Sequence, residues 1–320
     1  SGMSNLSNDQ GRAFEYATMQ TLAKEIGKVR KVSVIRNSSY VAAQKAWSAV
    51  PIDIKRNLKK SAVEAAQAVF DLEPMTLEDG DDVLELLIQP DQAGKGGDVR
   101  DVLIIRKCFQ WEIGLSLKHN HLAVKHSRLS NKIDFGYEWF GMKCSDQYWK
   151  DIKPIFAMLS AEKGKKTLWR NLPAKGNDVY LPILNAFVAE IKRSYKVYGS
   201  IVPLRMVEYL LGKFDFYKVI GQDRLRLTQI QAFNFRGKLN RASPRKKPVI
   251  IVPRSKLPDR IISIKVRPDK DNWVELCLNN GWQFGFRIHS ASTVVEASLK
   301  FDIGIIGMPA NILTIDRHWR

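Results

Sequence analysis

The segment from Trp111 to Ser130, WEIGLSLKHNHLAVKHSRLS, constrains the fold more than any other part of the chain. Its first residues alternate between apolar side chains and polar or small ones, and such alternation is typical of a β-strand with one buried face. Glu112, Ser116 and Lys118 would then share the open face. The strand would therefore end by presenting a hydroxyl and an ammonium group on one side of a sheet.

The residues before this strand predict an antiparallel hairpin. A glycine-rich turn leads into the aliphatic run VLII, and KCFQ reverses the chain before the alternating strand. A two-residue turn centred between Cys108 and Phe109 places Asp101 directly opposite Ser116. A register shifted by one residue would bring Asp98 to that face instead, because such a slip exchanges the two faces of a strand. Both aspartates are therefore candidate metal ligands, and we prefer Asp101.

A carboxylate across a hairpin from a lysine is the arrangement that metal-dependent phosphodiester cleavage requires. Mg²⁺ prefers one or two carboxylates together with waters and a phosphate oxygen of the substrate. The ion lowers the pKa of a bound water and neutralises the charge that develops on the phosphate. Lys118 would position or deprotonate the attacking water, or stabilise the pentacoordinate phosphorus. The hairpin therefore predicts Mg²⁺-dependent phosphodiester hydrolysis.

The charge of the chain predicts a polyanionic partner. The chain carries 51 Lys and Arg against 33 Asp and Glu, a net charge of +18. A field of this sign attracts nucleic acid, and double-stranded DNA is the partner that we expect. The segment from Arg224 to Lys270 contains fourteen of the basic residues and only two acidic ones. Its interleaved Phe and Pro residues are compatible with an arm that wraps DNA.

Other features argue against a membrane role and indicate a cellular location. The chain has no run of about 18 apolar residues that could span a bilayer, and no basic amphipathic helix with a bulky apolar face. The three cysteines lie far apart and outside any CxxC. This cysteine usage predicts reduced thiols in a cytoplasmic protein.

The pattern of apolar residues changes near residue 214. Helical patterns dominate before it, and short β-rich runs separated by Pro, Asn, Asp and Gly follow it. We expect helices at 7–28, 40–50, 51–74, 122–129, 147–161, 179–195 and 201–212. The β-rich runs are FYKVI, RLRLTQIQAFNF, KPVIIVP, RIISIKV, WVELCL and WQFGFRI. We therefore predict an α/β (α+β) protein with a nuclease core and helical additions at 3–213, and a β-rich basic DNA-recognition region at 214–320.

The hairpin resembles the catalytic core of the PD-(D/E)xK nuclease superfamily, in which an Asp begins one strand and an acid-x-Lys sequence lies on the next. Three blocks, GDVRDVLI, EIGLSLKHNHLAVKHSRLS and RIHSASTVVEASLKFD, resemble the HaeIII-type family of type II restriction endonucleases more specifically. The resemblance covers the hairpin and the segment after it well, the first helix moderately, and the C-terminal part by one block. It implies a restriction-endonuclease-like core, with a mixed sheet flanked by helices.

The resemblance also implies how the site is completed. In the superfamily a Glu on the first helix commonly joins the hairpin acids, and GRAFEYA offers Glu15 at that place. One departure is that Ser116 stands where the family usually has Asp or Glu. Either Ser116 takes a reduced ligand role beside Glu15 and Asp101, which we prefer, or Glu112 substitutes. Glu112 lies roughly 20 Å from Lys118 along the strand, which makes it the poorer candidate.

Polar residues after the hairpin are candidates for DNA contact. His119 and His121 form an HxH, but no Cys or His cluster elsewhere supplies the remaining ligands of a zinc site. Contacts to phosphates or base edges are the better interpretation, and Lys125 and Arg128 would share one helix face. The candidates are His119, Asn120, His121, Lys125, His126, Ser127, Arg128, Arg236, Arg245, Lys246, Arg287 and His289.

These features together predict a type II restriction endonuclease that hydrolyses both strands of duplex DNA at a short site, with Mg²⁺ as cofactor. The resemblance implies GGCC as the target, cut between the central G and C, and a cognate DNA methyltransferase as functional partner. A homodimer would suit such a target, because two-fold dimers often read short palindromes. The alternatives are a DNA repair or junction-cleaving nuclease, and a non-catalytic basic DNA-binding module, which the serine in the acid position keeps open.

Overall fold

The chain passes back and forth between two structural units. The computed structural model describes residues 2–121 and 123–320. The first unit comprises Ser1–Leu122, Gly212–Ser255 and Ala310–Arg320, and the second comprises Ala123–Leu211 and Lys256–Pro309. The expected division after residue 213 falls close to one of the crossings between the units. The β-rich segment that follows is nevertheless shared between both of them.

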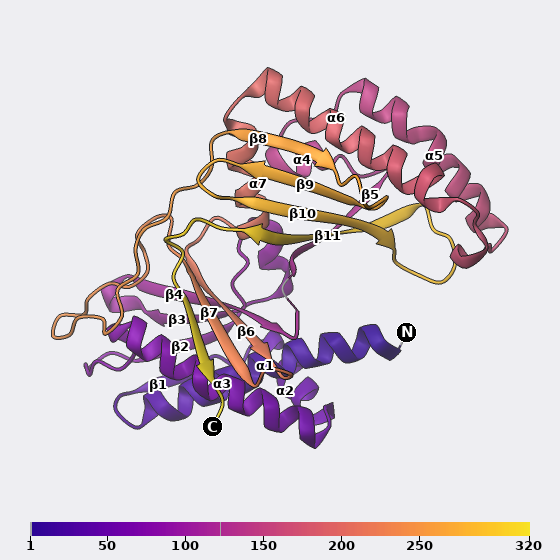
Figure 1. Ribbon diagram of the computed structural model, residues 1–320. Coiled ribbons are helices and arrows are strands. Elements are labelled where there is room, and N and C mark those ends of the chain that lie inside the picture. The colour runs from indigo at the N-terminus through magenta and orange to yellow at the C-terminus, as the bar shows by residue number, and fades with distance from the viewer. Residues whose placement is uncertain (1, 122) are drawn as a thin grey trace. The chain divides into compact units, whose positions relative to one another are not determined.

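A seven-stranded mixed sheet forms the centre of the first unit, in the order β1-β2-β3-β4-β6-β7-β12. β1 pairs with β2 and β4 with β6 in parallel, and the other neighbours are antiparallel. Helices α1, α2 and α3 lie together against this sheet (Figure 1). The predicted mixed sheet flanked by helices is thus confirmed. The elements of this unit are α1 (Gly2–Gly27), β1 (Val32–Val34), α2 (Ser38–Ala49), α3 (Ile52–Leu72), η1 (Pro74–Thr76), β2 (Leu84–Ile88), η2 (Asp91–Gly96), β3 (Val102–Arg106), η3 (Lys107–Phe109), β4 (Trp111–His119), β6 (Phe216–Gln222), β7 (Leu227–Phe233) and β12 (Thr314–His318).

Local sequence explains how the helices begin and which face of β4 they cover. Asn37 caps α2 by accepting the N–H of Tyr40 at 2.8 Å, and Pro51 precedes α3, where its fixed φ suits a helix start. Phe14 of α1 and Leu58 of α3 belong to one buried core with the odd-numbered residues of β4 from Trp111 to Leu117. The even-numbered residues of β4 are therefore left on the other face of the sheet, as the alternation predicts.

The hairpin of β3 and β4 adopts the preferred register. Val102 lies opposite Leu115, and the short turn η3 makes the reversal. Continuing this register places Asp101 opposite Ser116, and the N–H of Asp101 donates to the carbonyl of Leu115 at 2.8 Å. The shifted register that would bring Asp98 to this position is not adopted.

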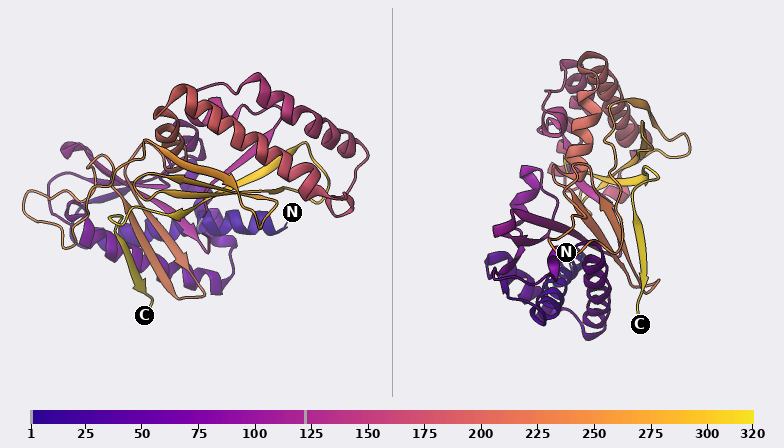
Figure 2. Two further views of the ribbon diagram at one scale, coloured as in Figure 1. Left: turned by 45° about the horizontal axis from the view of Figure 1, so that its top comes forward. Right: turned by 90° about the vertical axis from the view of Figure 1, so that its left-hand side faces the viewer.

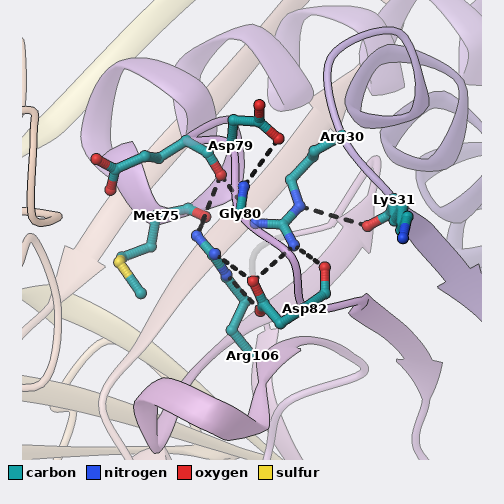
Figure 3. A network of polar contacts seen from close by, with 8 residues as sticks. Arg30, Lys31, Met75, Asp79, Gly80, Asp82 and Arg106 are labelled. Carbon is teal, nitrogen blue, oxygen red and sulfur yellow. Dashed lines mark hydrogen bonds and ion pairs between the residues drawn. The ribbon is translucent and has the colours of Figure 1, made fainter.

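A buried ion network fixes the other end of β3. Arg106 donates to both Asp82 oxygens, at 2.9 and 2.6 Å, and Arg30 lies 3.2 Å from the same carboxylate. Figure 3 shows the two guanidinium groups around Asp82, with the carbonyl of Met75 beside Arg106. The hydrogen bonds from Arg106, with a further contribution from Arg30, hold the pKa of Asp82 well below its usual range. The network ties the hairpin to the loop before β2.

The second unit is built on a five-stranded antiparallel sheet in the order β5-β11-β10-β9-β8. Helices α5 and α6 run side by side, and α6 packs against β8 and β9 (Figure 2). Aromatic rings fill the space between sheet and helices, with Phe187 of α6 against Phe286 and Phe301 of the sheet. The elements of this unit are β5 (Ala123–Ser130), α4 (Phe135–Phe140), α5 (Asp146–Gly164), η4 (Trp169–Asn171), η5 (Gly176–Tyr180), α6 (Leu181–Tyr198), α7 (Ile201–Leu211), β8 (Ile261–Val266), β9 (Trp273–Leu278), β10 (Gln283–Ser290) and β11 (Ser298–Gly307).

The helix expected at 122–129 is wrong, since residues 123–130 form the strand β5 (Leu122 lies outside the described residues). Ser127 and Leu129 are buried while His126 and Arg128 are exposed, which is the two-residue period of a strand. β5 pairs with β11 along its length. The three-residue spacing of Lys125 and Arg128 indicated a helix face. Residues 123–130 form a strand instead, because alternate side chains of this segment are buried against α7.

The run KPVIIVP forms no strand. The N–H groups of Val249 and Ile250 both donate to the carbonyl of Asp71, and that of Val252 donates to the side chain of Asn240. The two prolines remove donors that a ladder would need. The expected β-rich half is likewise not one sheet, because β6 and β7 join the sheet of the hairpin. Among the described residues, no helix has both the length and the apolar composition to cross a membrane.

Candidate active site

Asp101, Ser116 and Lys118 lie on the same face of the first unit's sheet. Asp101 opposes Ser116 in the register of the hairpin, and Lys118 follows two residues later on β4. The N–H of Leu117 donates to the Asp101 carboxylate at 2.7 Å, which fixes this side chain at the strand end. Ser116 is buried, whereas Asp101 and Lys118 are partly accessible. The predicted hairpin acid and lysine are therefore together at one accessible edge of the sheet.

The carboxylate of Glu15, from α1, interacts electrostatically with Asp101 and Lys118. Burial raises the pKa of Glu15 well above its ordinary value, and the negative charges of Asp101 and Asp91 raise it further. Burial also raises the pKa of Asp101 to about 6, against the opposing effect of Lys118. Two carboxylates that resist ionisation side by side, next to an ammonium group, are typical of a site that binds a cation or handles protons.

Asp91 is a third acid at this site that the sequence interpretation missed. It lies in η2 and is exposed, and its negative charge raises the pKa of both Glu15 and Asp101. Arg12 of α1 forms an ion pair with it at 3.1 Å. The sequence signal was an acid in the glycine-rich turn before the hairpin, and only the folded turn brings it back towards α1.

Lys218 of β6 is the second residue that was missed. It pairs in register with Ser116 on the neighbouring parallel strand, and paired residues of adjacent strands point to the same face. Its side chain is almost fully buried, with 4% exposed. Burial, with the like charge of Lys118, lowers the pKa of Lys218 to about 8. Its only signal in the sequence was a single lysine inside the apolar run FYKVI.

The two remaining acidic candidates, Asp98 and Glu112, lie in ion pairs with Arg100. Arg100 is 2.8 Å from Asp98 and 2.9 Å from Glu112. Its side chain crosses the face of β4 directly over Gly114, where an added Cβ would lie only 2.2 Å from its Cδ. The carboxylates of Asp98 and Glu112 thus hold Arg100 against the strand and are engaged in these ion pairs.

His119 and Asn120 are engaged within the first unit. His119 is buried, with one ring nitrogen 3.2 Å from Gln10 of α1 and the other 2.9 Å from Asp223. Asn120 accepts the N–H of Asp223 at 2.9 Å. This arrangement connects the end of β4 to the loop after β6, and it directs His119 away from the solvent. His121 is exposed.

Four of the predicted DNA-contact residues share the open face of the second unit's sheet. His126 and Arg128 on β5 lie opposite Asp302 and Lys300 of β11, which in turn lie opposite Arg287 and His289 of β10. His126 and His289 hydrogen-bond the two oxygens of Asp302, at 2.7 and 2.5 Å. Arg128 and Arg287 are exposed. Their side chains stand opposite the face that α6 covers.

Lys125 and Ser127 point to the other face of β5. The ammonium group of Lys125 lies 4.6 Å from the ring centre of Tyr209 on α7, and the Ser127 hydroxyl is 3.1 Å from the Tyr209 hydroxyl. The shared helix face expected for Lys125 and Arg128 does not exist, because residues three apart on a strand project to opposite sides.

The basic segment after β7 is held by carboxylates through its backbone. The N–H of Arg236 donates to Asp215 at 3.0 Å, and that of Arg245 donates to Glu78 at 2.7 Å. The side chains of Arg245 and Lys246 are exposed. The segment therefore has a fixed path, although it is neither helix nor strand, and it presents its charges to the solvent.

The donor set of the hairpin site fits a hard divalent cation. Glu15 and Asp101 offer carboxylate oxygens, the ligands that Mg²⁺ prefers, and waters and a phosphate normally complete its shell. Within residues 2–121 and 123–320, no three His, Cys, Asp or Glu side chains converge closely enough to bind an ion by themselves. Burial raises the pKa of both carboxylates, and the negative charge of Asp91 raises both further; a bound cation would offset these effects by favouring the ionised forms.

Comparisons with known proteins identify the family of this chain. The model of the family described as HaeIII restriction endonuclease matches residues 11–309. The Type II restriction enzyme HaeIII of Haemophilus aegyptius is 51% identical to this chain over 317 residues, which span 99% of either protein. No solved structure matches the chain.

Proposed function

The chain belongs to the HaeIII restriction endonuclease family, and from this premise we propose that it cuts both strands of duplex DNA at GGCC by a Mg²⁺-dependent hydrolysis at Asp101, Glu15 and Lys118. Its class, a type II restriction endonuclease, follows from the family and from the curated relative. The observation that carries the catalytic proposal is the meeting of two carboxylates with raised pKa values and a lysine at one end of β4.

In this proposal Asp101 and Glu15 hold the cation, and Ser116 occupies the usual place of the second hairpin acid. Mg²⁺, when bound, would supply Lewis-acid activation of a water and charge neutralisation on the phosphate. The Asp101 carboxylate is held in place by the N–H of Leu117. Both carboxylates are accessible enough to receive an ion from solvent, and both must be ionised to do so.

Lys118 acts on the attacking water. Its ammonium group lies near enough to lower the pKa of both carboxylates, so it can orient a water that approaches the phosphorus beside them. The water oxygen forms the new P–O bond. The existing P–O bond to one sugar breaks, and the sugar oxygen departs as the leaving group. The extra negative charge of the pentacoordinate phosphorus is stabilised by the same ammonium group.

The DNA-binding role is assigned to two basic surfaces, one on each unit. The first is the segment with Arg245 and Lys246, and the second is the open sheet face with Arg128 and Arg287. Exposed arginines suit phosphate and guanine contacts because the planar guanidinium group donates two parallel hydrogen bonds. His121, which is exposed where the chain leaves the first unit, is a further candidate.

Three parts of the proposal concern the biology of the enzyme. The family resemblance implies the target GGCC, with a cut between the central G and C. It also implies a methyltransferase that protects host sites. A homodimer would suit the two-fold symmetry of this target. A cytoplasmic location is proposed from the cysteine usage, because three separated free cysteines are typical of reduced thiols.

Digestion of a plasmid of known sequence tests the function. We expect discrete fragments whose ends map to GGCC in the presence of Mg²⁺, and none after chelation. Lys118→Ala should bind the plasmid and leave it intact, because it lacks the group that orients the water. Lys107→Ala is the matched control, since Lys107 is an exposed lysine at the opposite end of the same hairpin.

The outcomes separate the rival functions. Cuts at branched or damaged DNA, or a smear, would favour a repair or junction-cleaving nuclease. Ser116 in place of an acid is the observation that favours a non-catalytic DNA-binding module. That function would be supported if the wild-type protein binds DNA tightly but never cuts it with any divalent cation.

A further inference from the structure

The turn between β6 and β7 presents two arginines and a leucine at the end of β4. β4 and β6 are parallel, and His119, the residue after Lys118, is paired with Gly221. The turn occupies residues 223–226, directly after β6 ends at Gln222. The exposed residues of this turn are Arg224, Leu225 and Arg226. The DNA-binding surfaces proposed above do not include them.

Hydrogen bonds attach the first residue of the turn to the end of β4. The Asp223 carboxylate lies 2.9 Å from a ring nitrogen of His119 and accepts the side-chain amide of Asn120 at 3.3 Å. The Asn120 amide oxygen accepts the N–H of Asp223 at 2.9 Å, and the N–H of Asn120 donates to the carbonyl of Gly221 at 2.8 Å. The turn is therefore bonded to the two residues that follow Lys118.

The last residue of the turn is fixed as well. The N–H of Arg226 donates to the carbonyl of Asp223 at 3.1 Å, which closes the turn. The carbonyl of Arg226 accepts the N–H of Trp319 at 2.9 Å, and the indole of Trp319 donates to Thr228 of β7 at 2.9 Å. Because both ends of the turn are bonded to neighbouring segments, the backbone beneath Leu225 is held in one position.

The side chains of the turn suit a groove of duplex DNA. A single exposed leucine is common on protein surfaces and has no meaning by itself. Leu225, however, is 59% exposed between two arginines, on a turn bonded to the neighbours of Lys118. Proteins that enter a DNA groove frequently insert an apolar side chain between base pairs and use arginines beside it. The first and last Cα atoms of a closed turn lie less than about 7 Å apart, so its apex is narrow enough to enter a groove.

Resting on the proposed nuclease function, we propose that the turn 223–226 enters a DNA groove beside the scissile phosphate, where Leu225 inserts between base pairs and Arg224 and Arg226 bind phosphates on either side. The inserted side chain partly unstacks one base step and bends the duplex. The two guanidinium groups compensate the cost of this distortion, because charge-assisted hydrogen bonds to phosphate are strong. Leu225 takes no part in the bond-breaking step.

The test detects unstacking of bases in EDTA, so that no cleavage takes part. Duplexes with one GGCC site carry a single fluorescent base, either pyrrolocytosine inside the site or 2-aminopurine at an adenine beside it. The fluorescence of these bases rises when they lose their stacking neighbours, and anisotropy shows when the protein has saturated the DNA. With wild type, at least one position should brighten about twofold or more, and Leu225→Ala should lose most of this increase while it still binds.

Controls separate insertion from a structural role. Leu225→Met keeps a long apolar side chain and should retain the increase, and thermal melting without DNA checks that each variant folds. Val29→Ala is the matched control and should leave the increase unchanged, since Val29 is 52% exposed but follows the far end of α1. That end lies roughly 25 Å along the helix from Gln10, which contacts His119.

The salt dependence of binding tests the arginines. Arg224→Ala with Arg226→Ala should reduce the slope of the logarithm of the binding constant against that of the salt concentration by about 1.8, because two phosphate contacts are lost. An unchanged slope would contradict their role.

The outcomes distinguish the role of the turn from the nuclease function. A wild type that cuts at GGCC but brightens no probe would overturn the insertion of Leu225 and leave the nuclease function intact. Folded Leu225→Ala with the full increase would do the same. A wild type that neither binds nor cuts the duplex with Mg²⁺ would overturn the proposed function, and with it the role of the turn.

Discussion

At the scale of single residues, the most informative change is Asp101→Asn. The ionised Asp101 is opposed by burial and by its acidic neighbours, so its removal should stabilise the metal-free protein by about 1–2 kcal/mol while cleavage is lost. Mg²⁺ should raise the melting temperature of wild type and leave that of Asp101→Asn unchanged. Thermal melts with and without Mg²⁺ measure this, and a destabilised Asp101→Asn protein would contradict the assignment.

The raised pKa of Asp101 also predicts the sign of a pH effect. Because its pKa is about 6 in the folded protein and lower when unfolded, its contribution to stability is present in acid and is lost as the pH rises through about 6. The free energy of unfolding of wild type, measured in EDTA, should therefore fall relative to that of Asp101→Asn as the pH rises from about 4 to 7. Cleavage should show the opposite trend and fall below about pH 6, because the protonated carboxyl is a poor ligand for Mg²⁺.

At the scale of elements, the hairpin depends on a glycine. An added Cβ at Gly114 would lie 2.2 Å from the Arg100 side chain, which β4 can relieve only by expelling Arg100 from Asp98 and Glu112. Gly114→Ala should lower the free energy of unfolding by about 2 kcal/mol. Gly11→Ala is the control, because nothing lies within 4 Å of its added Cβ; in a helix this change should stabilise. Urea unfolding compares the two variants.

The loop before β2 and the strand β3 depend on one carboxylate. Asp82→Asn leaves the buried Arg106 and Arg30 without their counter-charge and should cost about 3 kcal/mol of stability. Because the pKa of Asp82 is held low in the folded protein, its stabilisation is present above about pH 4 and is lost as the pH falls further. Asp79→Asn, an exposed neighbour, should change little in the same urea titration at neutral pH.

At the scale of the whole molecule, the net charge of +18 should control DNA affinity through counterion release. The logarithm of the binding constant should fall linearly with the logarithm of the salt concentration. Arg245→Ala with Lys246→Ala should reduce that slope by about 1.8 if both residues contact phosphates. The matched pair Lys24→Ala with Lys45→Ala, which are exposed on α1 and α2, should leave it unchanged. Anisotropy titrations in EDTA from low to moderate salt provide the slopes.

The sequence by itself determined the local parts of this protein. The alternation in β4 and the reversal at KCFQ predicted the hairpin, because both signals lie within twenty residues of each other. They left open the register that chooses between Asp101 and Asp98, and the structure adopts the preferred one. The long helices α3 and α5 were predicted to within three residues at each end, and α1 begins five residues before its predicted start; apolar periodicity is a local signal that finds such helices. The placement of Ser116 and Lys118 on one face therefore follows from residue order alone, whereas the placement of Asp101 beside them depends on the register.

Only the tertiary structure decided which distant segments meet. Lys218 lies a hundred residues from Lys118 in the chain, and β6 becomes the neighbour of β4 through a parallel pairing that no local pattern encodes. The same holds for β5, which pairs with β11 instead of forming a helix, and for His119, which turns inward to Asp223. The period of apolar residues along a helix or strand predicts which of its sides is buried. Which other element covers that side depends on the packing of the whole chain.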